Sequence, residues 1–322
     1  MPIPITGQEL LYLSEAETAA LLPPAGKVAD EISRLVIGLH NGIVRTHPKG
    51  VMTADDMATF FIMATAMPGE LAGIKWLGGA PDNPARNIPA FLGLNLLSDA
   101  ETGSPLAIMG AAATTVLRTA AISLLGARAL AARDSRTLGL VGAGMQALAH
   151  LKAMREEFSI DHVFVTSVGT TAEQFRDRWS EPGLTIEVVD AETTISQSDI
   201  IISAVAADPG LTPFLDARRM KPGSFASMID LGKPWIVDHL DAFGHIYTDD
   251  RRSSEARGRT VEQMGMIRYD GDLNDLCGTE ISLAPAARTA MIFAGIPLAD
   301  FAAASLVYRR AVEQGAGRLM PL

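Results

Sequence analysis

The sequence is poor in cysteine, with a single one, Cys277, among its 322 residues. A disulfide within the chain is therefore impossible, which is usual for proteins of a reducing cytoplasm. No combination of cysteine and histidine has the spacing of a zinc site, so we expect no metal ion. These absences predict a cytoplasmic protein that depends on neither disulfides nor a metal.

Long apolar runs and an excess of basic residues are also missing. No apolar stretch reaches about 18 residues without a charge or an interruption, so we expect no membrane span. The start, MPIPITGQELL, lacks the basic residues and unbroken apolar stretch of a signal peptide. With a formal net charge of −10, the chain is not expected to bind nucleic acid or an anionic membrane. Any anionic ligand must be bound by cations concentrated in one pocket.

The remaining composition is that of a globular protein, with 48% hydrophobic and 20% charged residues. The length suggests two domains or one large one. Up to about residue 110, short apolar runs cut by glycine, proline and asparagine predict strands and turns, after a helix over 25–42. An alanine-rich helix is predicted over 112–134, and an amphipathic helix over 297–315. Between them, strands alternate with helices, which predicts βαβ units and a parallel sheet.

The segment LGLVGAGMQALAHLKAM, which begins at Leu138, predicts a dinucleotide-binding loop. Gly142, Gly144 and Ala147 follow an apolar strand and open a helix, with the spacing G-x-G-x-x-A. Gly142 allows a tight turn, and Gly144 lets a pyrophosphate approach the backbone at the positive end of the helix. Ala147 permits close packing of helix on strand. The alternative is a glycine turn without a ligand, and the spacing and context favour the dinucleotide.

The next strand, HVFVT, ends without the acidic residue that would bind the ribose of NAD. Thr166 and Ser167 stand there instead, and Arg176 is too far along to indicate NADP. We therefore expect NAD(P)H as the cofactor, with a preference for NADH.

Three motifs in order resemble the ornithine cyclodeaminase/μ-crystallin family: AGIKWLGGAPDNPARNIPAFLGLNLLSDAETGSPLAIM, LRTAA and LGLVGAGMQA. The resemblance runs from about residue 40 to 310. It implies an α/β fold with a doubly wound Rossmann domain at 126–299, which binds the nicotinamide cofactor. A second, α+β domain, 1–125 with 300–322, would bind substrate and form a homodimer. The family includes cyclodeaminases, alanine dehydrogenases and ketimine reductases.

The resemblance also implies roles for individual residues. Lys49, Lys75 and Arg118 would bind the substrate carboxylate, although the family has arginine where this chain has Lys49. Lys75 and Asp230 would be catalytic. The implied cofactor contacts are Arg118, Thr119, Gly142, Gly144, Met145, Gln146, Thr166, Ser167, Ser203, Ala204, Val205, Leu231 and Gly295.

Each of these polar residues also has a purely structural interpretation. Lys75 lies in an apolar stretch and could be an edge-strand lysine that reaches water. Arg118, before an alanine-rich helix face, could form a buried structural ion pair. Asp230, at the end of an apolar strand, could cap a helix or a turn. With the resemblance, we favour the functional interpretation for all three.

The charge around the expected substrate site suggests what it binds. Gly110 and Ala111 stand where family members commonly carry an acid, while Arg45, His47 and Lys49 lie close together in the sequence. This pattern favours a neutral or anionic substrate. We expect an NAD(P)H-dependent reductase of a small 2-imino acid, such as iminosuccinate reduced to aspartate, which in reverse is an L-amino-acid dehydrogenase. The alternatives are an ornithine cyclodeaminase and a non-catalytic, crystallin-like binding protein.

Overall fold

The computed structural model of the chain describes residues 7–54, 58–67, 69–80, 82–206, 210–251 and 267–322. The chain forms two compact units, which we call unit 1 (Met1–Arg118 with Ile296–Leu322) and unit 2 (Thr119–Gly295). The first boundary falls inside helix α3 (Ala112–Leu130), which contributes residues to both units.

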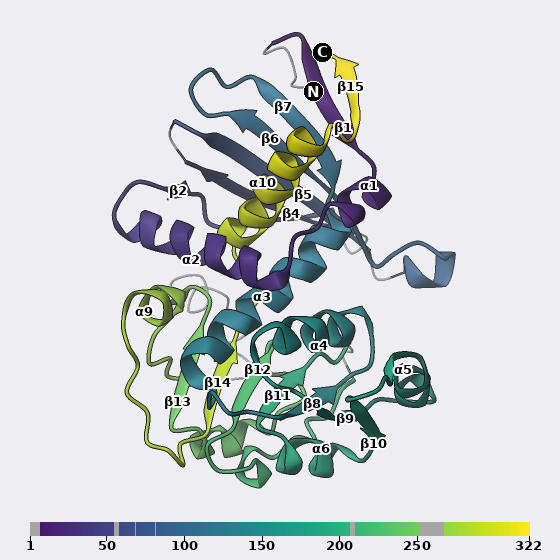
Figure 1. Cartoon of the computed structure of the whole chain (residues 1–322), viewed down its shortest axis with the longest axis vertical. Coiled ribbons are helices and arrows are strands. Elements are labelled where there is room, and N and C mark those ends of the chain that lie inside the picture. The colour runs from purple at the N-terminus through teal and green to yellow at the C-terminus, as the bar shows by residue number, and fades with distance from the viewer. Residues whose placement is uncertain (1–6, 55–57, 68, 81, 207–209, 252–266) are drawn as a thin grey trace. The chain divides into compact units, whose positions relative to one another are not determined.

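Unit 1 is built on one mixed sheet, with the order β15-β1-β7-β6-β5-β4-β2 and with β3 paired to β4 (Figure 1). Helices α10 and α2 pack together, and α10 lies on β4, β5 and β6. The strands are β1 (Glu9–Leu13), β2 (Arg45–Thr46), β3 (Gly50–Ala54), β4 (Ala58–Ala66), β5 (Leu71–Gly79), β6 (Phe91–Asp99), β7 (Pro105–Gly110) and β15 (Arg318–Pro321). The helices are α1 (Glu15–Ala20), α2 (Ala25–His40) and α10 (Pro297–Gln314), with a 3-10 turn at Pro84–Arg86.

Strands β6 and β7 pair antiparallel and form a hairpin, with DAETGSP at the turn. Within this turn, the side chain of Asp99 accepts hydrogen bonds from the backbone N–H groups of Glu101 and Thr102, at 3.1 and 2.7 Å. An aspartate that bonds its own turn in this way explains why the chain reverses here.

Helix α10 is amphipathic only in its second half, so the sequence-based prediction was wrong for its first half. From Pro297 to Ser305 every residue is buried, because this part lies against the sheet and α2. Half-buried and exposed residues return at Leu306 and continue, apart from the buried Val307 and Ala311, to the left-handed Gly315, which ends the helix. The buried first half carries one charged residue, Asp300.

Unit 2 is a Rossmann fold, as expected. Its sheet has the order β10-β9-β8-β11-β12-β14-β13, and every pairing is parallel. The strands are β8 (Thr137–Val141), β9 (His162–Thr166), β10 (Thr185–Val188), β11 (Ile200–Ser203), β12 (Phe225–Met228), β13 (His245–Thr248) and β14 (Thr289–Ile292). The helices are α4 (Met145–Glu157), α5 (Thr171–Trp179), α6 (Ala191–Gln197) and α9 (Leu273–Gly278), with 3-10 turns at Ala217–Arg219 and Val237–Ala242.

The strand order of unit 2 reverses between β8 and β11, which are neighbours in the sheet but not in the sequence. In open α/β sheets ligands bind outside the carboxyl ends of the strands at such a point. In the described part of the chain, no helix is both long enough and apolar enough to cross a membrane.

Candidate active site

The glycine loop joins β8 to α4, and its two glycines have different reasons to be there. Gly142 has a φ of +103°, and a Cβ on it would come within 2.6 Å of the carbonyl oxygen of Ala204. The fold itself therefore requires glycine at 142. Gly144 has an ordinary φ of −87°, and a Cβ there would meet nothing within 4 Å. Protein packing does not explain Gly144, whereas a ligand that approaches the backbone does.

The start of α4 suits an anionic ligand. No side chain caps its first turn, and that turn holds no acidic residue. Met145 is 76% exposed, whereas Ala147 is buried against the unit, as close helix packing requires. Unsatisfied N–H groups and the helix dipole favour a phosphate at such a terminus. The loop therefore fits the pyrophosphate of a dinucleotide.

Asp230 follows β12, at the same edge of the sheet. Its Oδ1 accepts hydrogen bonds from the Ser203 hydroxyl at 3.0 Å and the Gly232 N–H at 3.1 Å. Its Oδ2 accepts from the Val205 N–H at 3.1 Å. Burial nevertheless raises the pKa of Asp230 to about 7, against these hydrogen bonds. A carboxyl group with this pKa can both give and take a proton near neutral pH.

The other residues expected at the cofactor gather where strands of unit 2 end. Thr166 ends β9 and Ser203 ends β11. The segments that directly follow these strands and β12 hold Ser167, Ala204, Val205 and Leu231. Leu231 has a φ of +63°, a strained value for a residue other than glycine, and such strain is often found at functional sites. Gln146 lies in the first turn of α4, Thr119 is buried in α3, and Gly295 is the last residue of unit 2.

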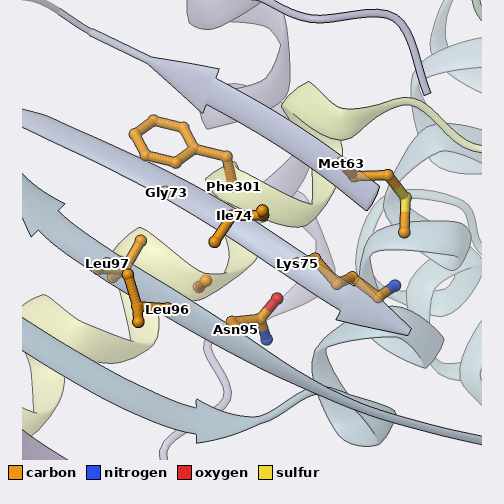
Figure 2. Close-up of a pocket in the computed structure, with 9 residues that line it drawn as sticks. Met63, Gly73, Ile74, Lys75, Asn95, Leu96, Leu97 and Phe301 are labelled. Carbon is orange, nitrogen blue, oxygen red and sulfur yellow. The ribbon is translucent and has the colours of Figure 1, made fainter. Parts of the chain in front are cut away.

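Lys75 lies in the middle of the unit 1 sheet, on β5 between β4 and β6, and is only 2% exposed. The edge-strand interpretation is therefore wrong. Its ammonium group donates to Oδ1 of Asp300 at 2.8 Å and to the hydroxyl of Thr115 at 2.6 Å. Figure 2 shows it beside Asn95, its partner on β6. Burial lowers the pKa of Lys75, and the charge of Asp300 opposes that effect.

Arg118 binds the same carboxylate oxygen. Its Nε lies 3.0 Å from Oδ1 of Asp300, and the residue is 7% exposed. The buried ion pair that we had weighed as an alternative is therefore real. It occupies only Nε, however, and within the described chain neither terminal nitrogen of Arg118 makes a hydrogen bond. Those two nitrogens form the fork that binds a carboxylate with two hydrogen bonds.

Asp300 is the residue of this cluster that sequence reasoning missed. Burial favours its neutral form, but the charges of Arg118 and Lys75 outweigh that effect and lower the pKa of Asp300. Its Oδ2 is buried, and among the described residues nothing donates to it. The sequence feature that could have indicated Asp300 is an acid in the first turn of an otherwise apolar helix, PLADFAAAS. Two cations expected in apolar surroundings also require a buried partner of opposite charge.

Lys49 lies on the same face of the sheet. Its ammonium group sits 4.5 Å from the centre of the Phe61 ring, and Phe61 and Met63 share one face of β4, with Met63 opposite Lys75. The charge of Lys49 also contributes to the low pKa of Asp300. Arg45 and His47 are exposed, and the His47 ring contacts the carbonyl of Pro48 at 2.7 Å.

Gly110 and Ala111 supply no acid at the start of α3, but the fold brings one there from another part of unit 1. The carboxylate of Glu15, from α1, accepts hydrogen bonds from the N–H groups of Ala112 and Ala113, at 3.2 and 2.6 Å. It occupies the space that a side chain on Gly110 would need. Its negative charge therefore stands where the sequence alone indicated none.

These features agree with a comparison of the chain with known families. The model of the ornithine cyclodeaminase/mu-crystallin family matches residues 25–315. The chain belongs to this family. Among its relatives, the alanine dehydrogenase of Archaeoglobus fulgidus is 29% identical over 78% of this chain and 81% of the relative. The iminosuccinate reductase of Paracoccus denitrificans is 28% identical over 76% and 78%.

Solved structures of family members have the same fold. An archaeal alanine dehydrogenase dimer with bound NAD superposes with a TM-score of 0.88 and 25% identity, over 97% of this chain and 99% of that one. The iminosuccinate reductase of Paracoccus denitrificans in complex with NAD⁺ gives 0.82 and 21% identity, over 98% and 100%. Both superpositions span nearly the whole chain, so the chain shares its fold with these two structures.

Proposed function

We propose that the protein is an NAD(P)H-dependent reductase of a small 2-imino acid, which in reverse oxidises an L-amino acid. The observation that carries the proposal is the cluster of Lys75 and Arg118 on a single oxygen of Asp300. Two cations with one anion leave one positive charge in a buried place, which is what a substrate carboxylate needs. The relatives named as dehydrogenases and reductases of amino and imino acids support it.

The residues would divide the work as follows. Arg118 binds the substrate carboxylate through its two terminal nitrogens. Lys75 adds the third N–H of its ammonium group, since two are already donated. The cofactor, when bound at the glycine loop, supplies the hydride. Asp230 supplies the proton to the substrate nitrogen in reduction and takes it back in oxidation.

For the substrate itself, we propose a dicarboxylic imine such as iminosuccinate. The charges of Arg118, Lys75 and Lys49 all act on the carboxylate of Asp300, so a second carboxylate on the substrate would have a cation within its reach. A hydrogen bond to a charged group contributes about 1.5–3 kcal/mol. We therefore expect a roughly ten- to hundredfold preference in kcat/KM over the imine of pyruvate.

That preference has a direct test. Lys49→Met keeps most of the side chain and removes the charge, so the ratio of kcat/KM between the imines of oxaloacetate and pyruvate should fall toward one. This ratio is measured for the parent enzyme and for Lys49→Met at the same salt concentration. If the parent enzyme prefers ornithine or a neutral cyclic ketimine, the dicarboxylic proposal is contradicted. The broader proposal of an imine reductase is then tested separately, by the substrate screen described below.

For the cofactor we propose NADH in preference to NADPH. The segment after β9 presents Ser167 and Thr171, whose hydroxyl groups bond each other at 2.7 Å. No cation lies between Thr166 and Thr171 to bind a 2′-phosphate. The ratio of kcat/KM with the two cofactors measures this preference.

We also propose that the protein is a homodimer that uses the face of the unit 1 sheet opposite α10. Side chains that alternate with Lys75 and Asn95 point away from α10 and form an apolar surface, namely Tyr12, Met52, Phe60, Trp76, Leu92 and Leu94. The rings of Phe60 and Trp76 pack at 5.3 Å. Exposed apolar patches of this kind are typical of interfaces. Trp76→Glu should shift the protein from dimer to monomer in sedimentation experiments.

A reductive-amination screen tests the function as a whole. It offers pyruvate, glyoxylate and oxaloacetate with ammonia, and cyclic ketimines without it, against NADH and NADPH. Oxidation of the cofactor with any of them supports the proposal. Proline formed from ornithine without net change in cofactor absorbance would instead indicate a cyclodeaminase. Tight cofactor binding with no turnover would indicate a binding protein.

A further inference from the structure

The two oxygens of Asp230 are not equivalent. Oδ1 accepts two hydrogen bonds, from the Ser203 hydroxyl and the Gly232 N–H, whereas Oδ2 accepts one, from the Val205 N–H. A carboxylate oxygen has two lone pairs in its plane. Those of Oδ1 are therefore both in use, and Oδ2 retains one.

The direction of the Ser203 hydroxyl decides whether this difference is fixed. The indole Nε1 of Trp235 lies 3.0 Å from the Ser203 oxygen, and both residues are fully buried. An indole N–H can only donate. Ser203 must therefore accept from Trp235, so it directs its own proton to Asp230. If Asp230 carried its proton on Oδ1, that proton would meet the proton of Ser203.

From this chain of donors we propose that Trp235 and Ser203 are positioning residues that confine the proton of Asp230 to Oδ2. The proposal rests on the proposed function only for what that proton does. In reduction, the Oδ2–H bond breaks and an N–H bond forms on the imine nitrogen. A bound NAD(P)H would supply the hydride that the imine carbon needs to complete the amine, and Asp230 is left as a carboxylate. In oxidation the same atom takes the proton back.

Charged neighbours do not account for the behaviour of Asp230. Burial and the hydrogen bonds of Ser203, Val205 and Gly232 are the main influences on its pKa, and no charged side chain is among them. On its own turn, Lys233 contacts Asp230 only through a backbone N–H that donates to the Asp230 carbonyl, at 3.4 Å. The polar contacts of the carboxyl group therefore control its titration.

A double-mutant cycle tests the proposal. Ser203→Ala removes a donor to the carboxylate and should raise the pKa of Asp230 by about one to two units, the equivalent of one hydrogen bond to a charged group. Trp235→Phe frees the Ser203 hydroxyl to turn and accept a proton from Oδ1. That stabilises the neutral acid, so the pKa should rise by up to about one unit. In the Ser203→Ala background, Trp235→Phe should change nothing, because Trp235 acts only through Ser203.

The pKa is read from the carboxyl carbon of Asp230 by NMR on protein with labelled aspartate, with the signal assigned by its loss in Asp230→Ala. This readout needs neither substrate nor turnover. A shift from Trp235→Phe that is equal in both backgrounds, or absent from both, overturns the proposal. So does an unchanged pKa in Ser203→Ala, a variant that decides the matter even if Trp235→Phe does not fold. If the expected pKa shifts are found but the protein turns over no imino acid, the proton of Asp230 is confined to Oδ2 as proposed. The proposed function is then refuted.

Discussion

The ammonium group of Lys75 lies 2.8 Å from Oδ1 of Asp300, although the two residues are 225 positions apart and both are buried. Asp300→Asn keeps the shape of the side chain and removes its charge, which leaves Lys75 and Arg118 as uncompensated buried cations. Loss of one member of a buried pair costs about 3–5 kcal/mol. We expect the free energy of unfolding, measured with denaturant near neutral pH, to fall by about that amount.

Glu31→Gln is the matched control. Glu31 also pairs with two arginines, Arg34 and Arg309, but both of these are considerably exposed. Glu31 itself is buried, but its two arginines reach water, so Glu31→Gln leaves no uncompensated buried cation and should cost less than the loss of a member of a fully buried pair. If Asp300→Asn cost no more than Glu31→Gln, the buried cluster would not be held together by charge.

The pKa of Asp230, raised by burial to about 7, predicts how stability and activity depend on pH. Between its ordinary value near 4 and 7, the folded state holds a proton that the unfolded state has lost. The contribution of Asp230 to stability therefore falls as pH rises through this window, by at most about 1.4 kcal/mol per unit. In Asp230→Ala this decrease should be absent from denaturation curves collected between pH 4 and 7.

The same carboxyl group should give opposite pH profiles in the two directions of the reaction. Reduction needs the protonated acid, so kcat for the imine should decline above about pH 7. Oxidation of the amino acid needs the carboxylate and should increase over the same range. Profiles with the same sense in both directions would show that another group transfers the proton.

Gly144→Val and Gly142→Ala should fail in different ways. Gly144 has open space around it, so the valine variant should have the unfolding temperature of the parent but bind the cofactor at least tenfold more weakly. Gly142 has a positive φ and a carbonyl against it, so even alanine should lower the stability, by more than 1 kcal/mol. Cofactor titration and thermal unfolding of both variants provide the comparison. Unchanged affinity in Gly144→Val would contradict the loop assignment.

Glu15→Ala should destabilise unit 1 by about 0.5–2 kcal/mol, because the N–H groups of Ala112 and Ala113 lose their acceptor. Glu101→Ala, at an exposed acid in the β6–β7 turn, serves as the control and should change the free energy of unfolding by less than about 0.5 kcal/mol. Equal effects of the two substitutions would mean that Glu15 does not cap α3.

The parts of the fold that local pattern specifies could be predicted from the sequence. Helices α2, α3 and α4 and the strands β8, β9 and β11 follow from apolar periodicity and from glycine and asparagine at their ends. Strands β13, β14 and β15 were missed, because each four-residue run has no more than two large apolar residues, whereas the equally short β11 begins with three isoleucines. Such short strands exist through their neighbours in the sheet and have little signal of their own.

The site shows the same limit. Lys75, Arg118 and Asp230 could be selected from motifs, but the partners of Asp300 and Glu15 could not be predicted, because they lie about 95 or more positions away in the sequence. The inference about substrate charge was the one most affected by this limit. It counted acids near Gly110 in the sequence, whereas the folded chain brings one there from α1.

Unit 1 contains both ends of the chain, with β15 paired to β1, while unit 2 is one continuous segment. During synthesis, residues 119–295 are therefore complete before the helix that carries Asp300 has been made. Until then Lys75 has no carboxylate to receive its charge, and its strand lacks the helix that covers it. The Rossmann unit can fold as the ribosome delivers it, whereas unit 1 must wait for residues 296–322.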